Sequence, residues 1–293
     1  MAELMLRPLG VGEIIDHSLA IYRRQFGALI TITLSANAIP LLLMVYLMTS
    51  GGILQQPLLY AGILLISVVL GALATAATVF LVSETYLGNT ISGGEAISHA
   101  TKYLWRLILL TMMVGLVVGL SVLIFLLPGL VTASPVLITL AMIPAFIVAL
   151  VIFTGLIIST PALVLEDASP TAALSRSWQL TRGFRWKMLG LLIVVGIIIA
   201  IPSLALGFLR GGGMAMKPMG EFSTADIAWE LAAQFASTLI YPLLYCALTV
   251  AYYDLRVRKE GFDLELLEST LAHALPSGRT SDLREHPKPP SPG

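Results

Sequence analysis

The chain has 293 residues, of which 57% are apolar and only 12% are charged, and its formal net charge is zero. Soluble domains carry about 25% charged residues, so this composition excludes an ordinary soluble protein. The single cysteine, Cys246, excludes an intramolecular disulfide.

The first predicted element is a short amphipathic helix at residues 12–26, whose apolar side chains recur at helical spacing. Residues 25–83 then run for 59 residues without any Asp, Glu, Lys or Arg. A membrane-spanning helix needs about 20 apolar residues. This stretch therefore predicts a helical hairpin, with spans at about 27–49 and 58–83.

The second predicted unit repeats this plan. An amphipathic segment at residues 94–107 leads into residues 107–165, which are again uncharged for 59 residues. We expect spans at about 107–128 and 136–160.

The third predicted unit begins with an amphipathic helix at residues 170–186. Pro170 suits its first turn and Ser169 its N-cap. Two uncharged runs follow and predict single spans at 188–209 and 231–252. The sequence thus predicts an all-α, polytopic membrane bundle of six transmembrane helices, with three interfacial amphipathic helices.

The basic residues are distributed unevenly between the two sides of this bundle. Of the 17 Lys and Arg residues, 15 fall on the side that holds both termini and 2 on the other side. Positive charge marks the cytoplasmic side of a membrane protein. We expect both termini and the amphipathic helices to be cytoplasmic, and the protein to reside in a bacterial inner membrane.

Polar landmarks point to an internal repeat. A shift of 82 residues brings polar positions and both ends of the uncharged hairpins into register, and a looser third unit follows at an offset of 159. Repeats are common in membrane folds, where binding sites often lie between the repeats. The matched pairs at the first offset are Gly12 with Gly94, Glu13 with Glu95, His17 with His99, Arg24 with Arg106, and Glu84 with Glu166.

The predicted domain boundaries follow from the end of the last span. Residues 1–265 form the membrane domain, and residues 266–293 form a cytoplasmic tail. We expect a short amphipathic helix to about residue 275, followed by a proline-rich, disordered segment.

Three segments carry a family resemblance: LRPLGVGEIID at 6–16, PALVLE at 161–166 and YYDLRVRKEGFDLE at 252–265. Together they resemble the bacterial membrane domain that precedes a glycerophosphodiester phosphodiesterase in some proteins. The resemblance covers about residues 6–265. It implies the membrane fold but no activity, because the βα alternation of the catalytic barrel is absent from these residues. No catalytic residue is carried over.

Two Glu-x-x-x-His pairs are candidate metal ligands, Glu13 with His17 and Glu95 with His99. A third ligand set is missing, so we favour solvated helix faces with weak polar pairs. No nucleophile elbow and no phosphate-binding loop occurs in the sequence. We therefore expect no catalytic residues, no cofactor and no metal site, and we interpret the protein as non-enzymatic.

Inside the predicted spans, only Cys246 and tyrosines are ionisable. Ion-coupled transporters usually place charged groups near the membrane midplane, so this absence argues against an ion-coupled pump. Two other features remain open. Polar or helix-breaking residues mark either kinks or broken helices at a site: Asn37, Pro40, Pro144 and Pro202. Small-residue pairs predict close helix packing in a compact bundle: Gly71 with Thr75, Gly115 with Gly119, and Gly155 with Ser159.

Two functional hypotheses remain after these exclusions. The leading hypothesis is a lipid- or envelope-associated scaffold, with membrane lipids, a homo-oligomer or a membrane protein as partners and no nucleic acid. The alternative is a transporter or channel for an uncharged or amphiphilic solute. A polar cavity between the repeats favours transport, whereas a closed, dry bundle favours the scaffold.

Overall fold

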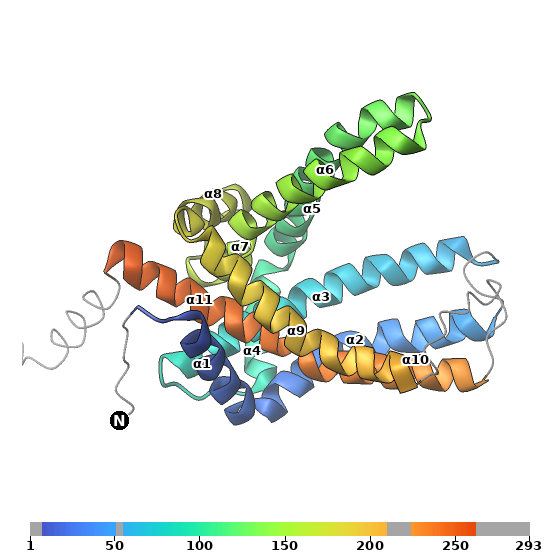
Figure 1. Cartoon of the computed structure of the whole chain (residues 1–293). Helices are drawn as coiled ribbons and strands as arrows, with labels where there is room; N and C mark the ends of the chain where they lie inside the picture. Colours follow the sequence, from blue (N-terminus) through green and yellow to red (C-terminus); the bar gives the residue numbers. More distant parts are fainter. Residues whose placement is uncertain (1–7, 51–54, 210–223, 262–293) are drawn as a thin grey trace, which may run out of the picture.

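The computed structural model describes residues 8–50, 55–209 and 224–261. The predicted tail at 266–293 lies outside these residues. Every regular element in the described part is helical (Figure 1). Six helical segments are long and apolar enough to cross a membrane, which confirms the all-α, six-span prediction.

The helices follow the predicted order. The three amphipathic helices are α1 (Val11–Arg24), α4 (Gly93–Ala100, continued by the short η1, Thr101–Tyr103) and α8 (Pro170–Thr181). The spans are α2 (Phe26–Thr49), α3 (Pro57–Tyr86), α5 (Leu104–Val131), α6 (Pro135–Leu156) with α7 (Ser159–Leu165), α9 (Arg185–Leu209), and α10 (Thr224–Ile240) with α11 (Pro242–Glu260).

The fourth and sixth spans are each divided, although the sequence predicted continuous helices there. Pro161 and Pro242 lie in the first turns of α7 and α11. A proline has no amide hydrogen to donate, so it fits the first turn of a helix, where no amide donor is required.

The three amphipathic helices are structural repeats of one another. They begin 82 and 159 residues apart, counted from α1, which are the two offsets predicted from the sequence. All three bury the same face, at the first, fifth and eighth residues of a shared pattern. These positions are Ile14, Ser18 and Ile21 in α1, Ala96, Ala100 and Tyr103 in the second unit, and Ala173, Ser177 and Leu180 in α8.

Local capping sets where these helices begin. The Glu13 carboxylate accepts a hydrogen bond from the Gly10 amide at 2.7 Å. Glu95 accepts the Ser92 amide at 2.7 Å, and Ser92 Oγ accepts the Glu95 amide at 3.2 Å, which completes a capping box. Ser169 caps α8 as predicted, since its Oγ accepts the Ala172 amide.

The units close into a ring at one end of the molecule. Each returning span packs against the amphipathic helix of the next unit: α3 against α4, α7 against α8, and α11 against α1. The returning segments α3, α7 and α11 also pack against one another and form the core. We call this the charged end of the bundle, because Glu84, Glu166 and Asp254 lie in or directly after the C-terminal halves of these helices.

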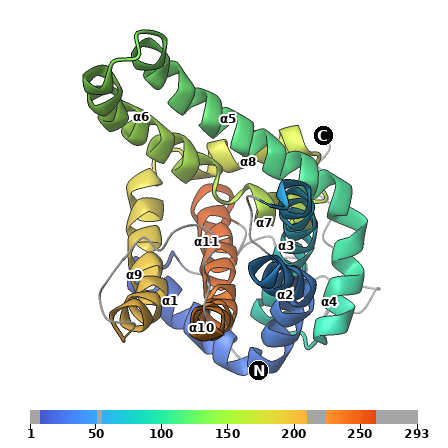
Figure 2. The ribbon, with the colours of Figure 1, turned by 90° about the vertical axis from the view of Figure 1, so that its right-hand side faces the viewer.

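The α5–α6 hairpin leaves this ring and extends away from the other spans (Figures 1 and 2). Only 11% and 6% of the most apolar windows of its two spans are buried. The prediction of a compact bundle is therefore wrong for this hairpin. Lipid chains are as apolar as leucine, so no hydrophobic force pulls the hairpin onto its neighbours.

Only one of the three small-residue pairs makes the predicted close contact. A Cβ atom at Gly155 would lie 2.5 Å from the Trp178 ring, whereas Gly71, Gly115 and Gly119 have no neighbouring atom within 4 Å of that position. Ser177 and Thr181 also donate hydrogen bonds to the Gly155 carbonyl, at 2.9 and 3.1 Å. Gly155 is thus the point where α8 is fixed to the hairpin.

This contrast gives a matched pair of variants. Gly155→Ala forces Trp178 to move and is expected to lower the melting temperature in detergent, as overpacking typically costs about 1–3 kcal/mol. Gly115→Ala meets open space and improves helix propensity, so it is expected to melt at or above the wild-type temperature. Equal melting of the two variants contradicts the tight contact.

Candidate functional site

Asp254 lies at the centre of the charged end and is 2% exposed. Its carboxylate accepts the backbone amide of Leu9 at 2.6 Å and forms ion pairs with Lys187 and Arg258. The Leu9 carbonyl in turn accepts hydrogen bonds from Lys187 Nζ and Arg258 Nη2, both at 2.7 Å. Asp254 therefore joins α9, α11 and the segment that enters α1.

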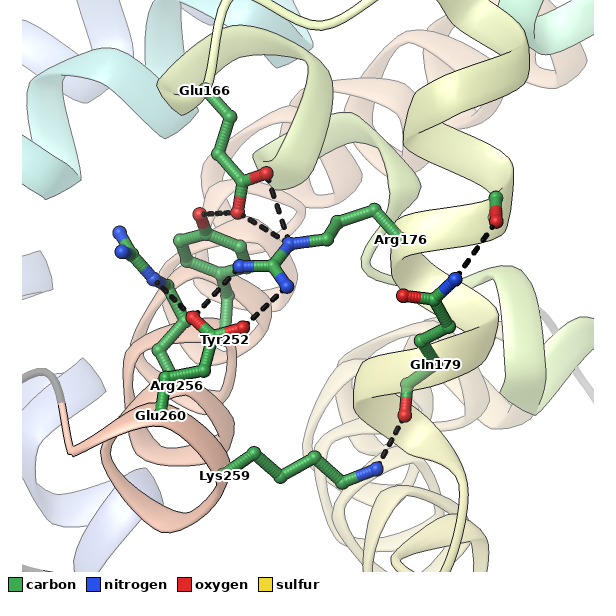
Figure 3. Close-up of polar contacts among 8 residues, drawn as sticks. Glu166, Arg176, Gln179, Tyr252, Arg256, Lys259 and Glu260 are labelled. Carbon is green, nitrogen blue, oxygen red and sulfur yellow. Dashed lines mark hydrogen bonds and ion pairs between the residues drawn. The ribbon is translucent and has the colours of Figure 1, made fainter.

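A second network lies beside it around Glu166 (Figure 3). The Glu166 carboxylate accepts Arg176 Nε at 2.8 and 3.0 Å and the Tyr252 hydroxyl at 2.6 Å. Arg176 continues to Glu260 through Nη2 at 2.7 Å, and Glu260 also accepts Arg256 Nε at 3.1 Å. The hydrogen bonds to Glu260 raise the pKa of Arg176 although burial opposes them, so Arg176 stays charged.

In these two networks, Asp254 and Glu166 pair with groups on other helices. Glu84, at the corresponding end of α3, instead accepts the Asn89 side chain from the next turn, at 2.7 Å. Lys259 adds a further link by donating to the Gln179 carbonyl of α8. Asp254, Glu166 and Glu260 are paired with cations, while Glu84 and Lys259 have uncharged partners, and together these contacts make the charged end a structural lock.

The candidate metal ligands do not come together. Glu13 and Glu95 are engaged in helix capping, while His17 is exposed. His99 stacks on Phe80 of α3, with ring centroids 3.7 Å apart. Within the described residues, no group of three or more His, Cys, Asp or Glu side chains is placed to hold a metal ion.

A polar cavity of about 230 Å³ lies between α2, α3, α10 and α11. It is thus formed by the first and third units. Gly71 on its wall is at the middle of α3, and Tyr245 lies nine residues before Asp254, about 13 Å along α11. The cavity is therefore at membrane depth, above the charged end.

Most of the described side chains that line the cavity are polar, and none of them is charged. Of the eleven described lining residues, eight carry hydroxyl or amide side chains, and none is Asp, Glu, Lys or Arg. The three others are Gly71, Ala74 and Pro242. The eight polar residues are Thr33, Asn37, Thr75, Thr78, Gln234, Thr238, Tyr241 and Tyr245.

Much of the hydrogen-bonding capacity of this wall is unused. Thr33, Thr75 and Thr238 donate to carbonyls four residues earlier in their own helices, at 2.7–2.9 Å, which leaves their oxygen lone pairs as acceptors. Among the described residues, the side chains of Thr78, Gln234, Tyr241 and Tyr245 have no hydrogen-bond partner. Polar groups at membrane depth gain free energy when a partner is supplied, so this wall suits a hydrogen-bonding ligand.

A broken helix borders the cavity. The chain bends between α10 and α11 at Tyr241 and Pro242, and the Leu239 carbonyl accepts the Tyr22 hydroxyl of α1 instead of a backbone amide. Burial raises the pKa of Tyr22 and so keeps its hydroxyl protonated. Discontinuous spans of this kind line the binding sites of many transporters.

A second cavity of about 300 Å³ lies on the other side of α3, where α5, α7 and α11 approach it. It shares Gly71, Thr75 and Tyr245 with the first cavity. The remaining lining residues are Ser67, Val68, Ala72, Leu107, Thr111 and Thr160.

Sequence reasoning found only part of this site. Of the residues marked as kinks or helix breaks, Asn37 lines the first cavity, whereas Pro40, Pro144 and Pro202 lie inside uninterrupted helices. The break at Pro242 was missed, although a proline in the middle of the sixth predicted span was its signal. Gly71 and Thr75 were read as a packing pair and instead border both cavities.

Comparison with protein families gave one match. A model described as a domain of unknown function, DUF7847, covers residues 11–255, and the chain belongs to this family. The match carries no link to glycerophosphodiester phosphodiesterases. Comparisons with curated proteins and with solved structures gave no match.

The ion pairs of the charged end yield a stability prediction. Asp254→Ala strands Lys187, Arg258 and the Leu9 amide, and removing one member of a buried pair costs about 3–5 kcal/mol. Asp16→Ala removes an exposed carboxylate of α1 and is expected to change stability by less than about 0.5 kcal/mol. Thermal unfolding of both variants in detergent tests this prediction. Equal stability of the two variants would show that the ion pairs of Asp254 do not stabilise the charged end.

Proposed function

We propose that this member of the DUF7847 family is a membrane transporter that binds an uncharged or amphiphilic molecule in its polar cavity. The observation that carries the proposal is the uncharged, hydrogen-bonding wall between the first and third units. Sites between repeats and beside broken helices are typical of transporters.

The described cavity wall carries no charged side chain, which argues against ion-coupled transport through this cavity. A charged solute at membrane depth requires an opposite charge or a shell of oriented dipoles to replace its water. The eleven lining residues supply only hydroxyl and amide groups. The proposed transport is therefore not coupled to ions through this cavity, and no chemical step accompanies it.

A scaffold function is the second candidate, and the exposed aromatic side chains of the amphipathic units favour it. Trp105 and Trp186 are 69% and 85% exposed near the charged end, where they suit the membrane interface. Tyr103, which also lies near the charged end, is buried against the core instead. Lipids contacted by these tryptophans would anchor an assembly without entering the cavity.

We further propose that the charged end faces the cytoplasm of a bacterial cell. The support is the excess of Lys and Arg on this side. The turn between α5 and α6 then faces outward.

Cysteine labelling in intact cells tests this orientation. Thr132→Cys places an exposed thiol in the outer turn, and Lys102→Cys places one at the charged end. A membrane-impermeant maleimide is expected to react with the first variant and not with the second. The native Cys246 is buried and should give little background. The reverse labelling pattern contradicts the orientation.

Transport is tested in proteoliposomes with two probes: glycerol, followed by vesicle swelling, and a fluorescent hexosyl diacylglycerol, followed by dithionite quenching. We expect faster movement of at least one probe than in protein-free vesicles. Gln234→Leu removes an amide from the cavity wall and should slow movement about fivefold, as for one lost hydrogen bond.

Gln179→Leu is the matched control, because Gln179 lies on α8 at the charged end and outside the cavity. It should behave like the wild type. If neither probe moves faster than in protein-free vesicles, transport is rejected and the scaffold function is favoured.

A further inference from the structure

We propose that the ligand of the polar cavity is a membrane lipid with an uncharged, hydroxylated head group, which reaches the cavity sideways between α3 and α5. This inference rests on the proposed function and specifies its ligand. The head group occupies the polar cavity, and an acyl chain occupies the second cavity.

The two cavities are neighbours across one ridge of α3. Gly71 and Thr75 are one helical turn apart and belong to both walls, and Tyr245 of α11 does so as well. No atom lies within 4 Å of the position that a Cβ would take at Gly71. Because Gly71 has no side chain, it leaves a gap between the two cavities, and a narrow ligand can pass through this gap beside the Tyr245 ring.

The two cavities differ by degree in the side chains that line them. Eight of the eleven described residues around the first cavity carry hydroxyl or amide groups. Around the second cavity five of nine carry hydroxyl groups, and the others are Val68, Gly71, Ala72 and Leu107. The larger aliphatic side chains, Val68 and Leu107, border only the second cavity, so a lipid that lies across Gly71 has its acyl chain there and its head group in the first cavity.

The second cavity opens at the membrane depth where lipid chains are found. Val68 is 44% exposed, and Thr111 of α5 is exposed as well. Thr111 belongs to α5, which extends away from α3 as part of the α5–α6 hairpin (Figure 1). An acyl chain that enters between α3 and α5 comes directly from the bilayer.

The chemistry of the wall selects the head group. Hydroxyl groups both donate and accept, so they match the tyrosine, threonine and glutamine side chains that lack partners. A phosphate head group would bring a negative charge into a cavity without a cation, at a large desolvation cost. Among the described residues, Arg176, Lys187 and Arg258 are already paired at the charged end.

The test uses two photoactivatable lipids with the same diazirine-bearing acyl chain in proteoliposomes of the full chain. One is a hexosyl diacylglycerol and the other is phosphatidylglycerol, which also carries hydroxyl groups but adds a negative charge. We expect the hexosyl lipid to label peptides of α3 and α5 around the second cavity, at least about tenfold more than phosphatidylglycerol does. Equal or stronger labelling by phosphatidylglycerol overturns the proposal.

Gly71→Leu fills the crossing between the cavities and should reduce labelling by the hexosyl lipid at least about tenfold. Gly115→Leu is the matched control, since Gly115 also sits in an apolar helix with no atom near its Cβ position but lies away from both cavities. It should label like the wild type. Melting temperatures verify that both variants fold.

Tyr245→Phe keeps the ring and removes the hydroxyl, and it should lower labelling about fivefold. Labelling that is the same in wild type, Gly71→Leu and Tyr245→Phe overturns the lipid site. If glycerol still crosses the membrane in that case, the proposed transport function stands without the lipid. If labelling follows the expected pattern but neither transport probe moves, the lipid site stands and transport fails.

Discussion

The buried carboxylate of Asp254 is the interaction on which the arrangement of the whole bundle depends. It binds the Leu9 amide and two cations, and so ties the last helix to the first across nearly the full length of the chain. The other returning segments contact the next amphipathic helix through short connections. The last returning helix, α11, instead packs against α1 of the first unit, and Asp254 closes the ring.

The contact between Asp254 and Leu9 holds the helices together at the charged end, whereas the helices separate at membrane depth. At the charged end, Arg176 forms ion pairs with both Glu166 and Glu260, and Arg256 supplies the second cation. At membrane depth, where charges are absent, the helices are held by weaker packing and diverge. The two cavities lie where the divergence begins, directly above the lock.

The repeat explains why the cavities are where they are. Three similar units surround the core, but the second hairpin departs from the other two. The first and third hairpins enclose the polar cavity, and the gap left by the second gives a lateral opening beside α3. The second hairpin thus departs from the threefold arrangement of the units. If it packed as the other two do, it would close the lateral opening of the site.

The sequence by itself determined the class and the order of the fold. The uncharged runs are long enough to cross a bilayer, where each segment satisfies its backbone hydrogen bonds by forming a helix. The offsets of 82 and 159 residues matched the starts of the three amphipathic helices. Only the tertiary structure decided that Gly71 borders two cavities while Gly155 is packed against Trp178. Both glycines look alike in sequence, since hydropathy sets which segments enter the membrane but does not set how close two helices approach there. That distance depends on contacts such as Leu9 with Asp254, which join residues far apart in the chain.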